Sequence, residues 1–191
     1  MEKGVMTLLK SGDEKTLKTW WENYSKHNAY PVTFCDLGID EKTKKWCASK
    51  GSLLTVSKDA KNTAFLKVEM LLKSPYDKTI WTDLDCEIRK DLAPLYEMSE
   101  CKDGFAISYD TKASSMQYEG GVFAFKKGSP FVDKWRDYCI KNSSDAQAEQ
   151  NGLKHLCNDP NLRITILSST FNWQEASIRS PHAAIYRNPS S

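Results

Sequence analysis

The sequence carries little net charge and has no long apolar run, and both shortages exclude classes of protein. Its 27 basic residues nearly balance 25 acidic ones, which argues against a protein that binds nucleic acid or an anionic membrane. No apolar stretch approaches the roughly 20 residues that a membrane-spanning helix needs. Hydrophobic residues still make up 40% of the 191 residues, so the chain can bury a core and is not disordered. Function therefore has to be sought in particular residues.

Cysteine pairs with the C-x-x-C spacing are also missing, so none of the six cysteines indicates a structural zinc site or redox motif of that kind. A chain of this length does not need disulfides, and we expect free, mostly buried thiols. The first twelve residues hold only a five-residue apolar run, broken by Lys10, and do not resemble a signal peptide. We expect a soluble protein of a reducing compartment, the cytoplasm.

The first 85 residues alternate between strand-like and helix-like patterns. We expect strands at 4–9, 31–37, 52–57 and 78–84, and helices at 14–27, 40–49 and 64–72. This alternation predicts βαβ units and a mainly parallel sheet. In the second half we expect strands at 104–109, 121–126 and 163–167 and helices at 129–142 and 145–157. No helical pattern separates the first two of these strands, so the sheet is predicted to be mixed. No internal repeat or linker is visible, which favours one α/β domain.

A pair of aspartates, Asp83 and Asp85, follows the apolar run Thr79-Ile80-Trp81. Ligands of open α/β sheets bind at the carboxyl ends of strands. If the chain stays extended there, residues i and i+2 point the same way, so both carboxylates could hold one divalent cation and, through it, a diphosphate. The alternative is a polar cap between a strand and a loop. Unpaired carboxylates beside a buried strand are costly, which favours the binding site.

Residues 65–85 resemble the helix, S-P-[FY] turn, strand and D-x-D of GT-A-fold glycosyltransferases, particularly glycogenin-like, bacterial galactosyltransferase-like and large-DNA-virus-encoded members. Residues 119–125 (EGGVFAF) resemble the family's N-[ST]-G-V-[FIV]-x-F strand beside the acceptor pocket. Residues 145–153 (DAQAEQNGL) resemble its D-Q-x-x-[LF]-N helix start, and 167–173 (LSSTFNW) its L-P-x-x-[FY]-N-W segment. The matches occur in the family's order and cover about residues 60–175.

The resemblance implies a single GT-A (Rossmann-like) domain over residues 1–191, with a mixed, mainly parallel sheet flanked by helices. Residues 1–85 would form the nucleotide-sugar-binding half and 86–191 the acceptor-binding half. The implied activity is metal-dependent transfer of a hexosyl or deoxyhexosyl group from a nucleotide-sugar, by preference a UDP-sugar, to a glycan or glycoprotein, with Mn²⁺ or Mg²⁺ as cofactor. We expect the host cytoplasm as its location if the chain is virus-encoded, and a catalytic module of a longer protein is compatible with its short length.

The resemblance also implies roles for the donor-side residues. Asp85 would be the principal metal ligand and Asp83 its partner, while His182 stands where many members place a third ligand, although the glycine of the family's H-x-x-G motif is missing. A surface histidine is the alternative for His182. The residues expected to contact the nucleotide-sugar are Leu8, Lys10, Asp36, Lys67 and Asp83; a solvated lysine is the alternative for Lys67.

On the acceptor side, an inverting enzyme needs a carboxylate that removes the acceptor's hydroxyl proton. Glu149 and Asp145 lie in the family's acidic segment, and Glu149 is preferred because Gln150 follows it; a helix cap and an exposed charge are the alternative. Acceptor contacts are expected from Glu119, Gly120, Gly121 and Trp173, with the two glycines allowing a sugar to approach the backbone. A buried core residue is the alternative for Trp173.

Two other functions stay open at this point. A nucleotidyltransferase also pairs carboxylates on an α/β sheet, but it usually has a glycine-rich phosphate loop after its first strand. Residues 9–12 (LKSG) are poor in glycine for that role. A non-catalytic module that binds nucleotides or glycans is the alternative of a different class.

Overall fold

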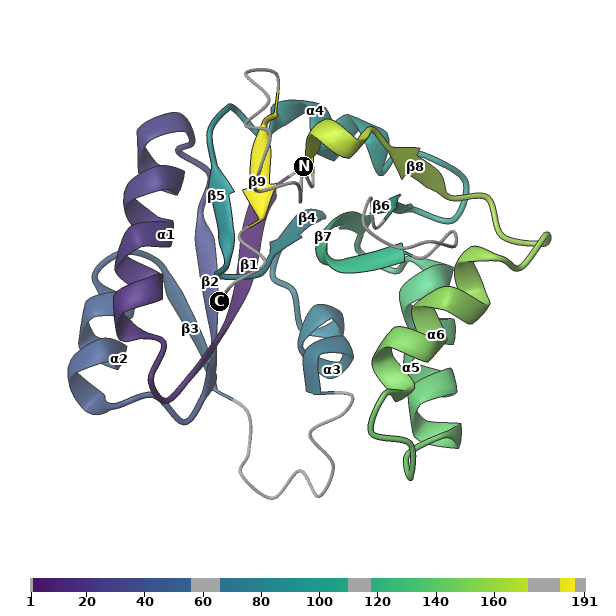
Figure 1. Cartoon of the computed structure of the whole chain (residues 1–191), viewed down its shortest axis with the longest axis horizontal. Coiled ribbons are helices and arrows are strands. Elements are labelled where there is room, and N and C mark those ends of the chain that lie inside the picture. The colour runs from purple at the N-terminus through teal and green to yellow at the C-terminus, as the bar shows by residue number, and fades with distance from the viewer. Residues whose placement is uncertain (1, 56–65, 110–117, 172–182, 188–191) are drawn as a thin grey trace.

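The computed structural model describes residues 2–55, 66–109, 118–171 and 183–187. Within these ranges, seven strands form one sheet in the order β3-β2-β1-β4-β7-β6-β8. The strands of this sheet are β1 (Lys3–Lys10), β2 (Val32–Leu37), β3 (Ser52–Thr55), β4 (Lys78–Thr82), β6 (Phe105–Tyr109), β7 (Tyr118–Lys126) and β8 (Thr165–Leu167). The sheet runs through the middle of the molecule, with helices on both sides (Figure 1).

The amino-terminal part of the sheet is parallel, as the alternating pattern predicts. β1 pairs in parallel with both β2 and β4, and β2 pairs in parallel with β3. The connections between these strands contain helices α1 (Glu14–His27), α2 (Glu41–Ala48) and α3 (Leu66–Leu72). The carboxyl ends of the neighbouring strands β1 and β4 therefore lie at the same edge of the sheet, the edge where ligands of such folds bind.

The remaining part of the sheet is mixed. β7 is antiparallel to β4 and β6, whereas β8 is parallel to β6. The helices of this part are α4 (Ala93–Met98), α5 (Pro130–Lys141) and α6 (Ala148–Cys157), followed by the 3₁₀ turn η2 (Ser169–Phe171). The predicted fold class, a mixed and mainly parallel sheet flanked by helices, is confirmed.

Two hydrophobic cores lie on the two faces of the sheet, because neighbouring residues of a strand point to opposite faces. Val5 and Ile80 belong to the core beneath α1 and α4, which contains Leu17, Trp20 and Tyr96. Their chain neighbours Met6 and Trp81 belong to the core beneath α3, α5 and α6, where Phe105, Phe131 and Trp135 stack or meet edge to face. Burial on both faces explains why β4 appears in the sequence as a short continuous apolar run.

A second, two-stranded sheet was not predicted from the sequence. β5 (Cys86–Ile88) follows the aspartate pair directly and is antiparallel to β9 (Ile185–Arg187), with Cys86 opposite Arg187. These strands of three residues are too short to show a periodic pattern, and α4 was missed as well.

The cysteines and the helices bear on two other expectations from the sequence. All six cysteines are free, and four of them are buried, as expected. In the described part of the chain, no helix combines the length and the apolar character that crossing a membrane requires.

Candidate functional site

The two aspartates of the D-x-D motif lie directly after β4, but not in an extended segment as we expected. The strand ends at Thr82, and the next four residues form a turn in which the Cys86 amide donates a hydrogen bond to the Asp83 carbonyl oxygen. The turn is attached to β7, because the Asp83 amide donates to the Gly121 carbonyl oxygen at 2.8 Å. Both carboxylates nevertheless approach one common group, so the turn achieves the convergence that we had expected from an extended strand.

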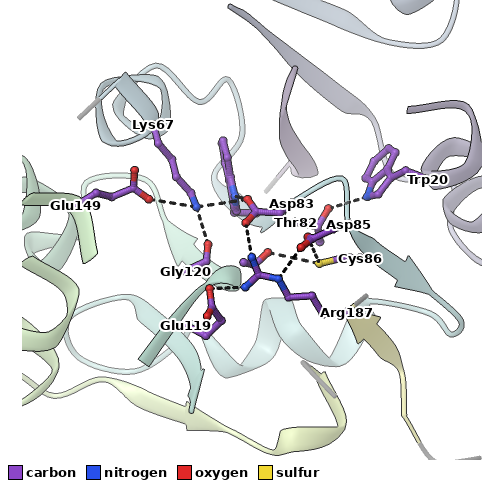
Figure 2. A network of polar contacts seen from close by, with 12 residues as sticks. Trp20, Lys67, Thr82, Asp83, Asp85, Cys86, Glu119, Gly120, Glu149 and Arg187 are labelled. Atoms are coloured by element: carbon purple, nitrogen blue, oxygen red, sulfur yellow. Dashed lines mark hydrogen bonds and ion pairs between the residues drawn. The ribbon is translucent and has the colours of Figure 1, made fainter. Parts of the chain in front are cut away.

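That common group is the guanidinium of Arg187 on β9, a residue that no motif in the sequence placed at this site. Arg187 Nε donates to Asp85 Oδ2 at 2.8 Å, and its Nη2 lies 3.5 Å from Asp83 Oδ2. Its Nη1 forms an ion pair with Glu119 on β7. Burial alone would lower the pKa of Arg187, but its hydrogen bond to Asp85 and the charge of Glu119 raise it above its usual value. Figure 2 shows the guanidinium between the three carboxylates.

A second buried cation, Lys67 on α3, connects the aspartate pair to α6. Its Nζ lies 3.4 Å from Asp83 Oδ1 and 3.4 Å from Glu149 Oε1, and donates a hydrogen bond to the Gly120 carbonyl oxygen at 2.6 Å. Burial would lower the pKa of Lys67, but Asp83 and Glu149 together raise it above its ordinary value. Lys67 is therefore a charged, buried group at the centre of the site, and the alternative of a solvated lysine is wrong.

Aromatic side chains hold this part of the site in place. The indole N–H of Trp81 donates to Asp83 Oδ1 at 2.7 Å, which leaves that carboxylate little freedom to turn. Lys67 Nζ lies 4.9 Å from the centre of the Trp81 ring and 5.5 Å from that of Phe123, both of which are fully buried. These contacts favour the cation over a neutral side chain at this position.

Gly121 of β7 makes room for the Arg187 guanidinium, whereas the side chain nearest to Gly120 is that of Leu153. A Cβ atom on Gly121 would lie 2.7 Å from Arg187 Nη1, and one on Gly120 would lie 3.5 Å from Lys67 Nζ. We had expected these glycines to let a sugar approach the backbone. In the structure, the Arg187 side chain lies next to Gly121, those of Leu153 and Lys67 lie next to Gly120, and Glu119 is paired with Arg187. Acceptor contacts from residues 119–121 stay a prediction.

A cavity of about 400 Å³ opens beside these groups at the carboxyl ends of β1 and β4. It brings together six of the residues that the sequence analysis selected: Leu8, Lys10, Lys67, Asp83, Asp85 and Glu149. Asp13, Thr16, Leu37, Leu66, Trp81 and Leu84 complete its lining. Five residues expected on the donor side and the acid expected on the acceptor side thus face one cavity, although they come from four separate segments of the chain.

Asp36 and Asp145 are not among the residues that line this cavity. Asp36 is 2% exposed, and its carboxylate accepts hydrogen bonds from the amides of Gly38 and Ile39 in the turn after β2. Asp145 accepts from the Gln147 amide and the Asn151 side chain just before α6, and these hydrogen bonds lower its pKa. Both carboxylates serve their local turns, and the expected roles of Asp36 in nucleotide binding and of Asp145 in catalysis stay predictions. His182 and Trp173 lie outside the described residues.

A divalent cation fits this site by charge and by donor type. Four carboxylates, those of Asp83, Asp85, Glu119 and Glu149, face two cations, Lys67 and Arg187, which leaves a formal charge of −2. Among the described residues, no three acidic, histidine or cysteine side chains form a group that could hold a metal ion. Mg²⁺ is commonly held by one or two carboxylates together with substrate phosphates. Asp83 and Asp85 could supply the protein's share of such a site.

Comparisons with known proteins give similarity of fold. No family model matches the chain, and no curated protein matches it in sequence. Among solved structures, the glycosyltransferase GlyE of Streptococcus pneumoniae TIGR4 superposes with a TM-score of 0.75 at 15% identity, covering 97% of this chain and 55% of GlyE. The chain thus spans about half the length of GlyE.

Two further glycosyltransferases resemble the chain over most of their own length. The galactosyltransferase LgtC, solved with donor and acceptor sugar analogues, matches with a TM-score of 0.63 at 14% identity over 96% of this chain and 86% of LgtC. Mouse xyloside xylosyltransferase 1 matches with a TM-score of 0.67 at 11% identity over 100% of this chain and 98% of its own. The chain therefore has the GT-A glycosyltransferase fold, as the sequence resemblance implied.

Proposed function

We propose that this protein is a metal-dependent glycosyltransferase that moves a sugar from a nucleotide-sugar to a glycan or glycoprotein. The observation that carries the proposal is the cavity at the carboxyl ends of β1 and β4, where the D-x-D carboxylates, Lys67 and Glu149 meet. The fold adds support, since a galactosyltransferase of the same fold was solved with donor and acceptor sugar analogues. A UDP-sugar is the donor we favour.

The donor would lie along the edge formed by β1 and the D-x-D turn. Leu8 and Lys10 line the cavity on the β1 side, where a nucleotide base and ribose could pack, and Asp83 and Asp85 line it on the other. A diphosphate is strongly anionic and the charged cluster has a formal charge of −2, so the two would repel each other without a further cation. Asp83 and Asp85 would hold Mn²⁺ or Mg²⁺, which supplies neutralisation of the diphosphate as the sugar–oxygen bond breaks.

The acceptor would approach from the side of α6. Glu149 is the acid of this helix that reaches the cavity, and its side chain is 30% exposed. If transfer inverts the anomeric configuration, Glu149 would take the acceptor's hydroxyl proton as the new bond forms. Lys67, between Asp83 and Glu149, fixes the donor-side and acceptor-side carboxylates relative to each other. We assign it a positioning role.

Calorimetric titration with UDP-, GDP- and dTDP-sugars, with and without Mn²⁺, tests the donor site. We expect one donor to bind only with Mn²⁺ and Asp85→Ala to lose that binding at least tenfold, because half of the carboxylate pair is gone. Asp137→Ala on the exposed surface of α5 is the matched control and should bind like the wild type. A folded protein that binds no donor, with or without Mn²⁺, would contradict the proposal. Donor binding without any nucleotide release in the presence of candidate acceptors would favour the non-catalytic binding module.

A further inference from the structure

Arg187 occupies the place at the D-x-D carboxylates that a divalent cation would take. Its guanidinium contacts both members of the pair, at 2.8 Å from Asp85 and 3.5 Å from Asp83. We infer that Arg187 and the divalent cation are alternative occupants of this pair, so that the cation binds only when the guanidinium withdraws. The inference depends on the proposed function for the identity of the cation, and it goes further by assigning Arg187 as the residue that sets the cation's affinity.

The two occupants exclude each other for electrostatic and steric reasons. Asp85 Oδ2 accepts the Arg187 Nε hydrogen bond, so the same oxygen cannot also face a metal ion along that direction. A dication beside a guanidinium is repelled strongly in a partly buried site, and the Arg187 side chain is only 21% exposed. Binding of the cation must therefore break the contact between Arg187 and the aspartates.

The structure also provides a partner for the displaced guanidinium. Glu119 lies on the other side of Arg187 and pairs with Nη1, whereas the two aspartates contact Nε and Nη2. Arg187 can therefore keep its ion pair with Glu119 while it releases the aspartates. Glu119 reduces the cost of withdrawal, which explains a carboxylate next to the glycine pair without requiring it to touch a sugar.

The contact is set by backbone pairing and by one glycine. Cys86, the residue after the D-x-D, lies opposite Arg187 in the β5–β9 pair, which brings the arginine to the motif across 102 residues of sequence. The guanidinium lies over Gly121, where a Cβ atom would come within 3.0 Å of its central carbon. An alanine at 121 would push the end of the Arg187 side chain away and leave its charge in the protein.

Mn²⁺ titration of the free protein, followed by calorimetry or by the electron paramagnetic resonance signal of unbound Mn²⁺, tests the inference without measuring catalysis. We expect Arg187→Ala to bind Mn²⁺ on the order of tenfold more tightly than the wild type, because it removes both the competing group and its charge. Gly121→Ala should also bind more tightly, by a smaller factor. Arg136→Ala removes an exposed arginine from α5 and should leave the affinity unchanged.

Several results would overturn the inference. Unchanged or weaker Mn²⁺ binding in folded Arg187→Ala would contradict it. Tighter binding in Arg187→Ala with no change in folded Gly121→Ala would also contradict it, because loss of the positive charge alone would then explain the tighter binding. A donor that binds without Mn²⁺ and is lost in Arg187→Ala would mean that arginine replaces the cation permanently. If neither wild type nor variants bind Mn²⁺, competition is excluded, while nucleotide-sugar binding in parallel titrations still decides the proposed function separately.

Discussion

The two ends of β4 carry the same kinds of charged groups in different proportions. At the amino-terminal end, Lys78 pairs with Glu100, which also accepts from Lys126 at 2.8 Å. Lys3 pairs with Glu97 at 2.9 Å in the same group. Three lysines thus face two glutamates, and each glutamate is directly paired. This group has no surplus of negative charge that would attract another cation.

At the carboxyl-terminal end the balance is reversed. Four carboxylates share Lys67 and Arg187, and four members of this group, Lys67, Asp83, Asp85 and Glu149, line a cavity of about 400 Å³. The same strand therefore ends in a closed ion-pair group on one side and in an anionic site on the other. Ion pairs alone therefore do not mark a binding site. A surplus of one charge beside a cavity does mark a binding site, because that surplus attracts a ligand of the opposite charge.

Removing one buried lysine from each end of β4 tests whether the two groups differ in energy. Lys67→Met leaves Asp83 and Glu149 without their shared cation and should lower the free energy of unfolding by about 3 kcal/mol or more. Lys78→Met leaves Glu100 paired with Lys126, so a smaller loss of about 1 kcal/mol is expected. Urea unfolding followed by circular dichroism measures both. Equal losses would show that the two groups are energetically alike and that the surplus charge has no consequence.

A second test separates the two acids of the α6 region. Glu149→Gln keeps the shape of a cavity-lining side chain but removes the base, and should lower turnover at least roughly 100-fold with donor affinity little changed. Asp145→Asn should retain nearly full turnover, because that carboxylate serves the turn before α6. Nucleotide release from the donor is the measurement, with thermal unfolding as a check on folding. Full activity in Glu149→Gln would exclude it as the base.

The features that could be predicted from the sequence are those that produce a local pattern of residues. β4 and the D-x-D could be predicted because burial on both faces leaves a continuous apolar run, after which two carboxylates stand out. Glu149 was found through a local motif. Arg187 could not be found, since its position depends on the pairing of two three-residue strands, and the resulting contact between Arg187 and Asp85 spans 102 residues. Asp36 was selected by analogy of fold and Asp145 through the family's acidic segment. Their hydrogen bonds to turn backbone could not be foreseen, because an acid at a turn looks the same in sequence whether it caps the backbone or binds a ligand.

The ion-pair group at the amino-terminal end of β4 should make a small, pH-dependent contribution to stability through Glu100. Hydrogen bonds from Lys126 and Lys78 lower the pKa of Glu100 from 4.5 to about 2. A lowered pKa means that the folded protein binds fewer protons than the unfolded chain between these values, so this contribution to stability is full above about pH 4.5 and is lost as the pH falls towards 2.

Glu100→Gln should therefore unfold at a lower temperature than the wild type at neutral pH, and the difference should shrink on acidification. Glu22→Gln, an exposed glutamate of α1, is the control and should show no such convergence. A difference for Glu100→Gln that stays constant down to about pH 2 would mean that the glutamate contributes through packing, and the amino-terminal group would then not be the ion-pair counterpart of the anionic site.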